Sequence, residues 1–158
     1  MERVDAVLRH PLFTEHIQKN MASEATRIFC KHDLPHALDV ARIAYILCLE
    51  EGLDAPKETV YAAAILHDIT RWRQYAEGVP HNESAVVPAA LILRECGFAP
   101  EEISMICGAI LHHRDGAGDE TFAKLLYRAD KLSRACFDCP AAAECNWDDS
   151  RKNLILRY

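Results

Sequence analysis

The stretch "AAAILHDITRW", residues 62–72, begins as an apolar run and then places His67 and Asp68 side by side. Its first residues have the composition of a buried helix, where an unpaired imidazole or carboxylate is costly. Two interpretations follow. The pair either caps the end of a buried helix or belongs to a metal site, and the rest of the chain decides between them.

The bulk composition is that of one ordinary globular domain. The chain has 158 residues, of which 50% are hydrophobic and 27% charged, enough for one proper core. A net charge of -6 argues against a nucleic-acid-binding face. The charged N-terminus has no apolar signal region, and no run reaches the ~18 apolar residues of a membrane helix. We therefore expect a cytoplasmic protein with reduced thiols and with neither membrane nor nucleic acid as a partner.

Helical periodicity runs through most of the chain, and no segment alternates as a strand does. Helices are expected over residues 11–30 and 35–51 and in segments that open near Pro56, His81, Pro100 and Thr121. Gly52 and Gly97 predict helix ends, and Pro88 predicts a kink or a late start. Residues 70–80 are expected to form a loop.

The pattern predicts an all-α protein, a single compact domain of about six or seven helices. Residues 1–134 would form its main body. Residues 135–158 would form a Cys-containing C-terminal capping segment of the same domain, with a short helix over residues 146–158 that packs Leu154, Ile155 and Tyr158.

Polar residues interrupt the apolar faces of five of the expected helices. A single such residue would most often be a satisfied core histidine or a cap, but several buried together need a cation to neutralise them. Imidazole and carboxylate ligands suit Fe, Mn, Co, Ni or Zn. The candidate residues are His36, His67, Asp68, His81, His112, His113 and Asp130.

The ordered series resembles the HD-domain superfamily of metal-dependent phosphohydrolases, and in particular its two-metal branch with six ligands. The segments "HALDVARIA", "AAILHDI" and "YRADKLSR" look like that family's first helix, its His-Asp pair and its terminal Asp helix. The similarity covers roughly residues 29–134. It implies a helical HD-type domain and two divalent transition-metal ions, Fe, Mn, Co or Ni, with Zn or Mg as alternatives.

The resemblance also implies a role for each ligand. The first ion would be held by His36, His67, Asp68 and Asp130, and Asp68 would bridge to a second ion held by His81 and His113. His113 is preferred to its neighbour His112 because the family pattern counts from Ala109-Ile110, and because it continues the helix stripe of Ile106 and Ala109.

His32 offers a competing His-Asp pair, His32-Asp33. His36 is the better ligand because it precedes the inward-facing Val40 by one helical turn. His32 and Asp33 are expected to form a turn and a helix N-cap.

The implied activity is hydrolysis of a phosphoester or phosphoanhydride of a small molecule, plausibly a nucleotide, with a metal-bridging hydroxide as nucleophile. Asp68 would orient the hydroxide. Lys131 and Arg71 are the cations expected to assist catalysis, and the substrate-binding set is Lys131, Arg71, Arg73 and Arg114. Trp72 and Tyr75 would either stack a nucleobase or pack within their loop.

Other interpretations stay open at this point. Cys136, Cys139 and Cys145 would form a structural metal or iron–sulfur site, or they are separate free thiols, which we favour. The same six ligands also occur in di-iron oxygenases, and a non-catalytic regulatory module would keep the metal without turnover. The expected partner is a small phosphorylated substrate, and a homodimer is possible.

Overall fold

The computed structural model describes residues 1–114 and 121–158, which form eight α-helices, one short 3-10 turn and no strand. The all-α class is therefore confirmed. The elements are α1 (Glu2–Arg9), α2 (Pro11–Ser23), α3 (Leu34–Glu51), α4 (Lys57–Leu66), α5 (Arg71–Glu77), α6 (His81–Glu95), α7 (Pro100–His112), α8 (Thr121–Leu132) and η1 (Cys136–Asp138).

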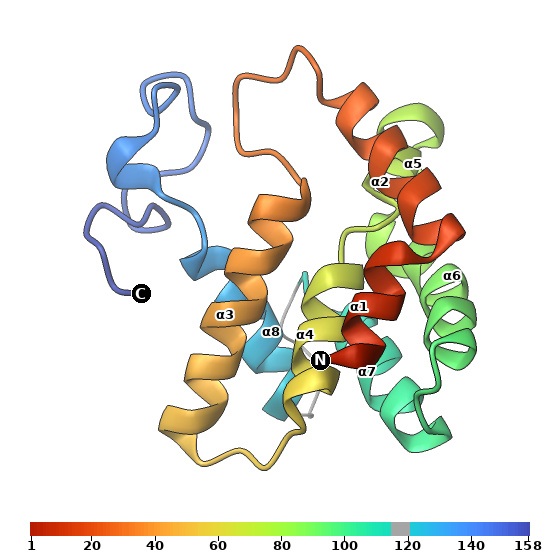
Figure 1. The fold of residues 1–158 in the computed structure, drawn as a ribbon. Helices are drawn as coiled ribbons and strands as arrows, with labels where there is room; N and C mark the ends of the chain where they lie inside the picture. Colours follow the sequence, from red (N-terminus) through yellow and green to blue (C-terminus); the bar gives the residue numbers. More distant parts are fainter. Residues whose placement is uncertain (115–120) are drawn as a thin grey trace.

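Helix α4, which carries the apolar run, lies at the centre of the fold. It packs against α3 on one side and against α1, α6 and α7 on the others (Figure 1). Its residues from Thr59 to Leu66 are almost all buried, and its three consecutive alanines let neighbouring helices approach closely. An apolar surface on every face is the property of a helix surrounded by others.

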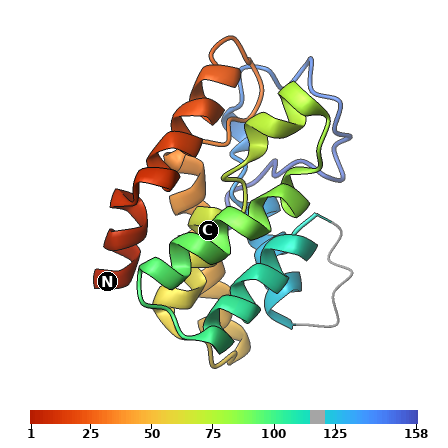
Figure 2. The same ribbon diagram turned by 90° about the vertical axis from the view of Figure 1, so that its right-hand side faces the viewer.

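The remaining helices are arranged around α4 in pairs. Helix α8 packs against α3 and α7, and α6 lies beside α7, as Figure 2 shows from the side. In Figure 1 the chain beyond α8 lies on the α3 side of the molecule, away from α1 and α2. Within the described residues, no helix combines the length and apolar character needed to cross a membrane.

Local signals set the ends of α3 as expected. Asp33 is its N-cap and accepts a hydrogen bond from the backbone N–H of His36 at 3.1 Å. Gly52 ends it with a φ of 67°, a left-handed conformation that glycine adopts without steric cost.

The expected helix over residues 11–30 was too long. Helix α2 ends at Ser23, and Ile28 is exposed. The chain turns because the buried carboxylate of Glu24 accepts hydrogen bonds from the backbone N–H and the ring of His32, at 2.7 and 2.5 Å. These contacts hold residues 24–33 as a closed loop.

The expectation of a loop was wrong, and one of the two alternatives for Pro88, the late start, does not hold. Residues 71–77 form helix α5 instead of a loop, although α5 buries none of its residues fully, so it carries no apolar stripe that could be recognised. Helix α6 starts at His81 and continues past Pro88 without a late start.

The short helix expected over residues 146–158 is also absent, since these residues form turns and bends. Leu154 and Ile155 are exposed, and Tyr158 is 41% exposed. Instead, the side chain of Asn153 donates hydrogen bonds to the carbonyl oxygens of Lys131 and Arg134, at 2.6 and 3.0 Å. The segment is therefore held by polar contacts to the end of α8 and not by an apolar face.

Candidate metal centre

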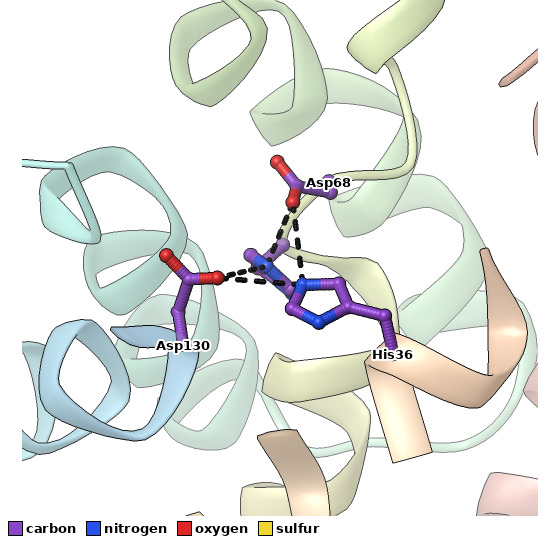
Figure 3. A group of neighbouring side chains, drawn as sticks. His36, Asp68 and Asp130 are labelled. Carbon is purple, nitrogen blue, oxygen red and sulfur yellow. Dashed lines mark ion pairs between the residues drawn. The ribbon is translucent and has the colours of Figure 1, made fainter. Parts of the chain in front are cut away.

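The structure brings all six predicted ligands together. Each lies where an apolar helix face meets the centre of the bundle: His36 on α3, His67 and Asp68 directly after α4, His81 at the start of α6, His113 directly after α7 and Asp130 on α8. All six are buried. Figure 3 shows the side chains of His36, Asp68 and Asp130 converging from separate parts of the fold.

The ligand atoms form two groups that share one carboxylate. His36, His67, Asp68 and Asp130 each offer an atom within 4.8 Å of the others, and Asp68, His81 and His113 do the same. Asp68 directs Oδ2 to the first group and Oδ1 to the second, with Oδ2 2.9 Å from His67 Nε2 and Oδ1 3.0 Å from His81 Nε2.

The outer nitrogen of each histidine is already engaged. Nδ1 of His67 and of His113 donates to the carbonyl oxygen three residues earlier, Ala64 and Ile110, at 2.6 Å in both cases. Such bonds fix the tautomer, so Nε2 is left as the free lone pair that faces the centre.

The other two histidines are oriented by side chains. Nδ1 of His81 lies 2.6 Å from Gln74 Oε1 and 2.7 Å from Arg71 Nη1, so both side chains hold its outer edge. Nδ1 of His36 lies 3.2 Å from Ser133 Oγ, whose own hydrogen goes to the carbonyl of Asp130. All four imidazoles therefore turn Nε2 inward.

This arrangement fits a divalent metal site. His67 Nε2 and Asp68 Oδ1 are buried without a hydrogen-bond partner, which is unfavourable unless another group satisfies them. Nε2 of His81 and Nε2 of His113 lie 3.0 Å apart, close enough for both to bind one cation. The observed donors are therefore those that an ion would need.

The protonation states suit the same purpose. Burial lowers the pKa of His36 and of His81 to about 4, so both rings are neutral near neutral pH, the form that binds metals. Burial raises the pKa of Asp68, but its electrostatic interactions with His67 and other neighbouring groups outweigh burial and hold this pKa well below the usual range. Asp130 behaves in the same way: burial raises its pKa, but its contact with His36 and the charge of Arg134 hold the pKa well below the usual range.

His32 was expected only to form a turn, yet its ring reaches the edge of the centre. It is buried, and its Nε2 lies 3.9 Å from Asp68 Oδ2. Glu24, which also accepts from Tyr75 Oη at 2.6 Å, fixes the proton of His32 on Nδ1 and directs Nε2 toward Asp68. Sequence reasoning missed Glu24, because its position depends on how residues 24–33 fold back.

Asn20 on α2 is a second residue that the sequence did not single out. Its buried amide donates to the carbonyl oxygen of Asp68 at 2.9 Å and accepts from the backbone N–H of Trp72 at 2.8 Å. Asn20 therefore clamps the backbone on both sides of the turn that presents Asp68.

The predicted cations divide into three placements. Lys131 Nζ lies 2.5 Å from Asp130 Oδ2, and Arg71 lies against His81, 2.7 Å from its Nδ1, so both border the centre. Arg114 follows His113 and lines a neighbouring cavity together with Lys131. Arg73 instead pairs with Glu77 and lines a separate surface pocket, so the structure does not bring it to the centre.

Arg134, which sequence reasoning also missed, contacts two of the predicted ligands. Its buried guanidinium is 3.0 Å from Asp130 Oδ1 and 3.1 Å from His36 Nε2. The available signal was its spacing: it follows Asp130 by four residues, one helical turn.

The remaining predicted site features are not part of the centre. Trp72 packs on α2, where its indole N–H donates to His16 Nδ1 at 2.9 Å, so it is not free to stack a base. Cys136, Cys139 and Cys145 are free, and among the described residues only His and Asp side chains form groups of three or more potential ligands. The Cys metal or cluster site is therefore not supported.

Comparison with known proteins identifies the family. The HD domain model matches residues 34–135, about two thirds of the chain, so this protein belongs to the HD-domain family. An uncharacterized protein of Clostridium beijerinckii is 45% identical over 158 residues, the full length of both chains. The fold is similar to the crystal structure of a predicted HD superfamily hydrolase from an uncultured Thermotogales bacterium, with a TM-score of 0.65, 24% identity and coverage of 88% of this chain and 80% of that one.

Proposed function

We propose that this protein hydrolyses a phosphoester or phosphoanhydride of a small molecule, and that the substrate is a nucleotide. One observation carries the proposal: two groups of inward-facing ligands are joined by a single carboxylate, Asp68, and bordered by cations. Ions held there would polarise a phosphoryl oxygen and lower the pKa of a bound water toward neutrality. Fe, Mn, Co and Ni are the proposed ions, because imidazole and carboxylate donors suit them.

The protein's own residues would organise this reaction. Asp68 presents one oxygen to each group and so sets how the two sites face each other. The Nδ1 hydrogen bonds of the histidines prevent their rings from turning when substrate binds. The site is therefore organised before substrate arrives.

Charge on the transferred phosphoryl group would be met by side chains at the rim of the centre. The Lys131 ammonium and the Arg134 guanidinium contact different oxygens of Asp130, so both lie beside the first group. Fixed cations aimed at developing negative charge are among the largest contributions to phosphoryl transfer. Their position favours a phosphate substrate over an uncharged organic one.

His32 would act on the substrate side of Asp68. Its Nε2 faces Asp68 Oδ2, and Glu24 holds the ring in that direction. From there, Nε2 of His32 can form a hydrogen bond with an oxygen of a substrate phosphoryl group bound next to Asp68. The net charge of -6 favours a small substrate that enters a local cationic pocket over a long polyanion.

The test begins with protein purified without chelator. Its metal content is measured, and the metal-free form is then reloaded with Fe, Mn, Co or Ni and assayed for phosphate release from mononucleotides, nucleoside polyphosphates and sugar phosphates. We expect metal-dependent release that His67→Ala abolishes and the matched control His112→Ala leaves intact. Oxygen uptake by the reduced iron form with an organic substrate, and no phosphate release from any compound, would overturn the proposal.

A further inference from the structure

A cavity of about 660 Å³ lies next to the metal centre, between the end of α8 and the C-terminal segment, defined here as residues 136–158. Lys131 joins the two sites, because it lines the cavity and its Nζ also contacts Asp130 Oδ2. Trp147, Arg151 and Arg157 of the C-terminal segment also line the cavity. These three lie beyond residue 135, where the match to the HD domain ends.

The cavity is strongly cationic. Among the described residues, four arginines and a lysine line it, against a single carboxylate: Arg114, Arg128, Lys131, Arg151, Arg157 and Glu50. Arg128 is neutralised by Glu51, and Glu50 accepts from Tyr158 Oη. Arg157 has no carboxylate within ion-pair distance among the described residues, and Arg151 has only Asp148 at 4.0 Å. Positive charge therefore remains for a ligand.

Aromatic rings flank the lysine that joins the two sites. Lys131 Nζ lies 5.2 Å from the ring centroid of Tyr127 and 5.9 Å from that of Trp147. Both rings are partly exposed in the wall of the cavity. A planar ring can stack on such side chains while the arginines bind its charged groups.

Polar contacts fix this wall in place. Asn153 donates to the carbonyl oxygens of Lys131 and Arg134, and Lys152 Nζ donates to Ala142 at 3.3 Å. The C-terminal segment is therefore anchored to the helix that carries Asp130.

We propose that this cavity binds the part of the substrate beyond the scissile phosphate, and that the substrate is a nucleoside polyphosphate. The inference rests on the proposed function. The base would stack against Trp147, the further phosphates would bind Arg151 and Arg157, and the scissile phosphate would lie past Lys131 at the metal centre. The volume is within the range of sites for small ligands.

The kinetic test compares a nucleoside triphosphate with p-nitrophenyl phosphate, which has one phosphate and no second anionic group. For the double variant Arg151→Gln/Arg157→Gln we expect KM for the triphosphate to rise about tenfold or more, the loss of at least one charged hydrogen bond. Its kcat, and kcat/KM for p-nitrophenyl phosphate, should stay near wild type. Lys124→Gln, an exposed charge on α8 outside the cavity, is the matched control.

The aromatic contact is tested in the same way. Trp147→Ala should raise KM for the triphosphate, whereas Phe137→Ala, which removes a ring of the C-terminal segment outside this cavity, should not. Equal loss of activity on both substrates in either cavity variant would overturn the inference, and so would an unchanged KM for the triphosphate.

A binding experiment separates this inference from the proposed function. A methylene-bridged nucleoside triphosphate analogue is titrated calorimetrically into wild-type protein and the double variant, both reloaded with metal. If wild-type protein hydrolyses nothing but binds the analogue more tightly than the variant does, the proposed function fails and the cavity assignment stands. If it hydrolyses phosphate esters but binds the analogue no better than the variant, the cavity assignment fails alone.

Discussion

The imidazole rings of His67 and His113 meet edge to face, with their centroids 5.0 Å apart, and each follows the last residue of its helix. In both, Nδ1 bonds a carbonyl oxygen of that helix and Nε2 faces the other ligands of its own group. A helix cap and a metal ligand, the two interpretations of His67 in "AAAILHDI", are therefore compatible. Nδ1 satisfies a carbonyl group at the helix end, and Nε2 remains available to a metal.

The first prediction separates two adjacent histidines. His113→Ala should lose the metal of the second group, because Nε2 of His113 belongs to that group alone. The same variant should retain the metal of the first group. His112→Ala should retain all of its metal. Elemental analysis of both variants after dialysis checks this, and equal metal content in the two would contradict it.

The second prediction concerns the shared carboxylate. Asp68→Ala should reduce metal binding in both groups, whereas Asp130→Ala should affect the first group alone. Replacing Asp39, an exposed carboxylate on α3, controls for the loss of one negative charge. If Asp68→Ala folds normally by circular dichroism and keeps its full metal content, Asp68 does not link the groups.

The third prediction concerns Lys131. Lys131→Ala should lower kcat by about 10²-fold, the usual effect of removing one preorganised charge donor, and leave metal content unchanged. The reason is that its ammonium contacts Asp130 Oδ2, whereas Oδ1 of that residue faces the histidines. Metal loss in proportion to lost activity would instead mean that Lys131 supports the ligand and not the substrate.

The fourth prediction concerns the clamp formed by Asn20. Asn20→Ala should destabilise the protein by about 1–3 kcal/mol, because two buried backbone groups lose their partner. Urea unfolding measures the effect, and Gln18→Ala, an exposed change on the same helix, is the control. A variant as stable as that control would show that water replaces the amide.

The fifth prediction concerns acid stability. Hydrogen bonds from Arg3 lead the lowering of the pKa of Glu102 to about 2, and Arg3 also bonds Glu58 at 2.7 Å. A carboxylate with a depressed pKa stabilises the fold above its ordinary pKa, 4.5, and this contribution disappears as the pH falls toward 2. Arg3→Met should therefore be less stable than wild type at pH 7.

The stabilities of Arg3→Met and wild-type protein should converge as the pH falls from 4.5 to 2, because the carboxylates become protonated in both proteins. Arg9→Met, an exposed change on the same helix, should follow wild type across the whole range. Chemical unfolding of metal-free protein at a series of pH values measures this, and a constant difference between Arg3→Met and wild type would refute it.

The sequence predicted the elements with strong apolar stripes and the ligands that lie on those stripes. His36 precedes Val40 by one turn on α3, and both are buried as expected. The sequence did not predict α5, whose residues bury no continuous face, or the extended C-terminal segment, whose apolar residues stay exposed. An apolar residue is buried only where another part of the chain packs against it, and local composition does not show whether such a surface exists.

The missed site residues depend on contacts between distant segments. Arg134 reaches His36, 98 positions earlier, and Asn20 reaches the carbonyl of Asp68, 48 positions later. Neither contact leaves a periodic signal, because a single polar residue has many potential partners in the chain. The histidines could be found because each repeats the same environment, a polar residue at the edge of an apolar helix face.

The distribution of the ligands along the chain has a consequence for biosynthesis. Each group contains a member from the last part of the chain, Asp130 in the first and His113 in the second. While the ribosome is still making α7, four of the six ligands already exist but neither group is complete. A metal ion could therefore find the full ligand set of either group only after most of the chain has been made, and a product that terminates before α8 would lack the carboxylate that closes the first group.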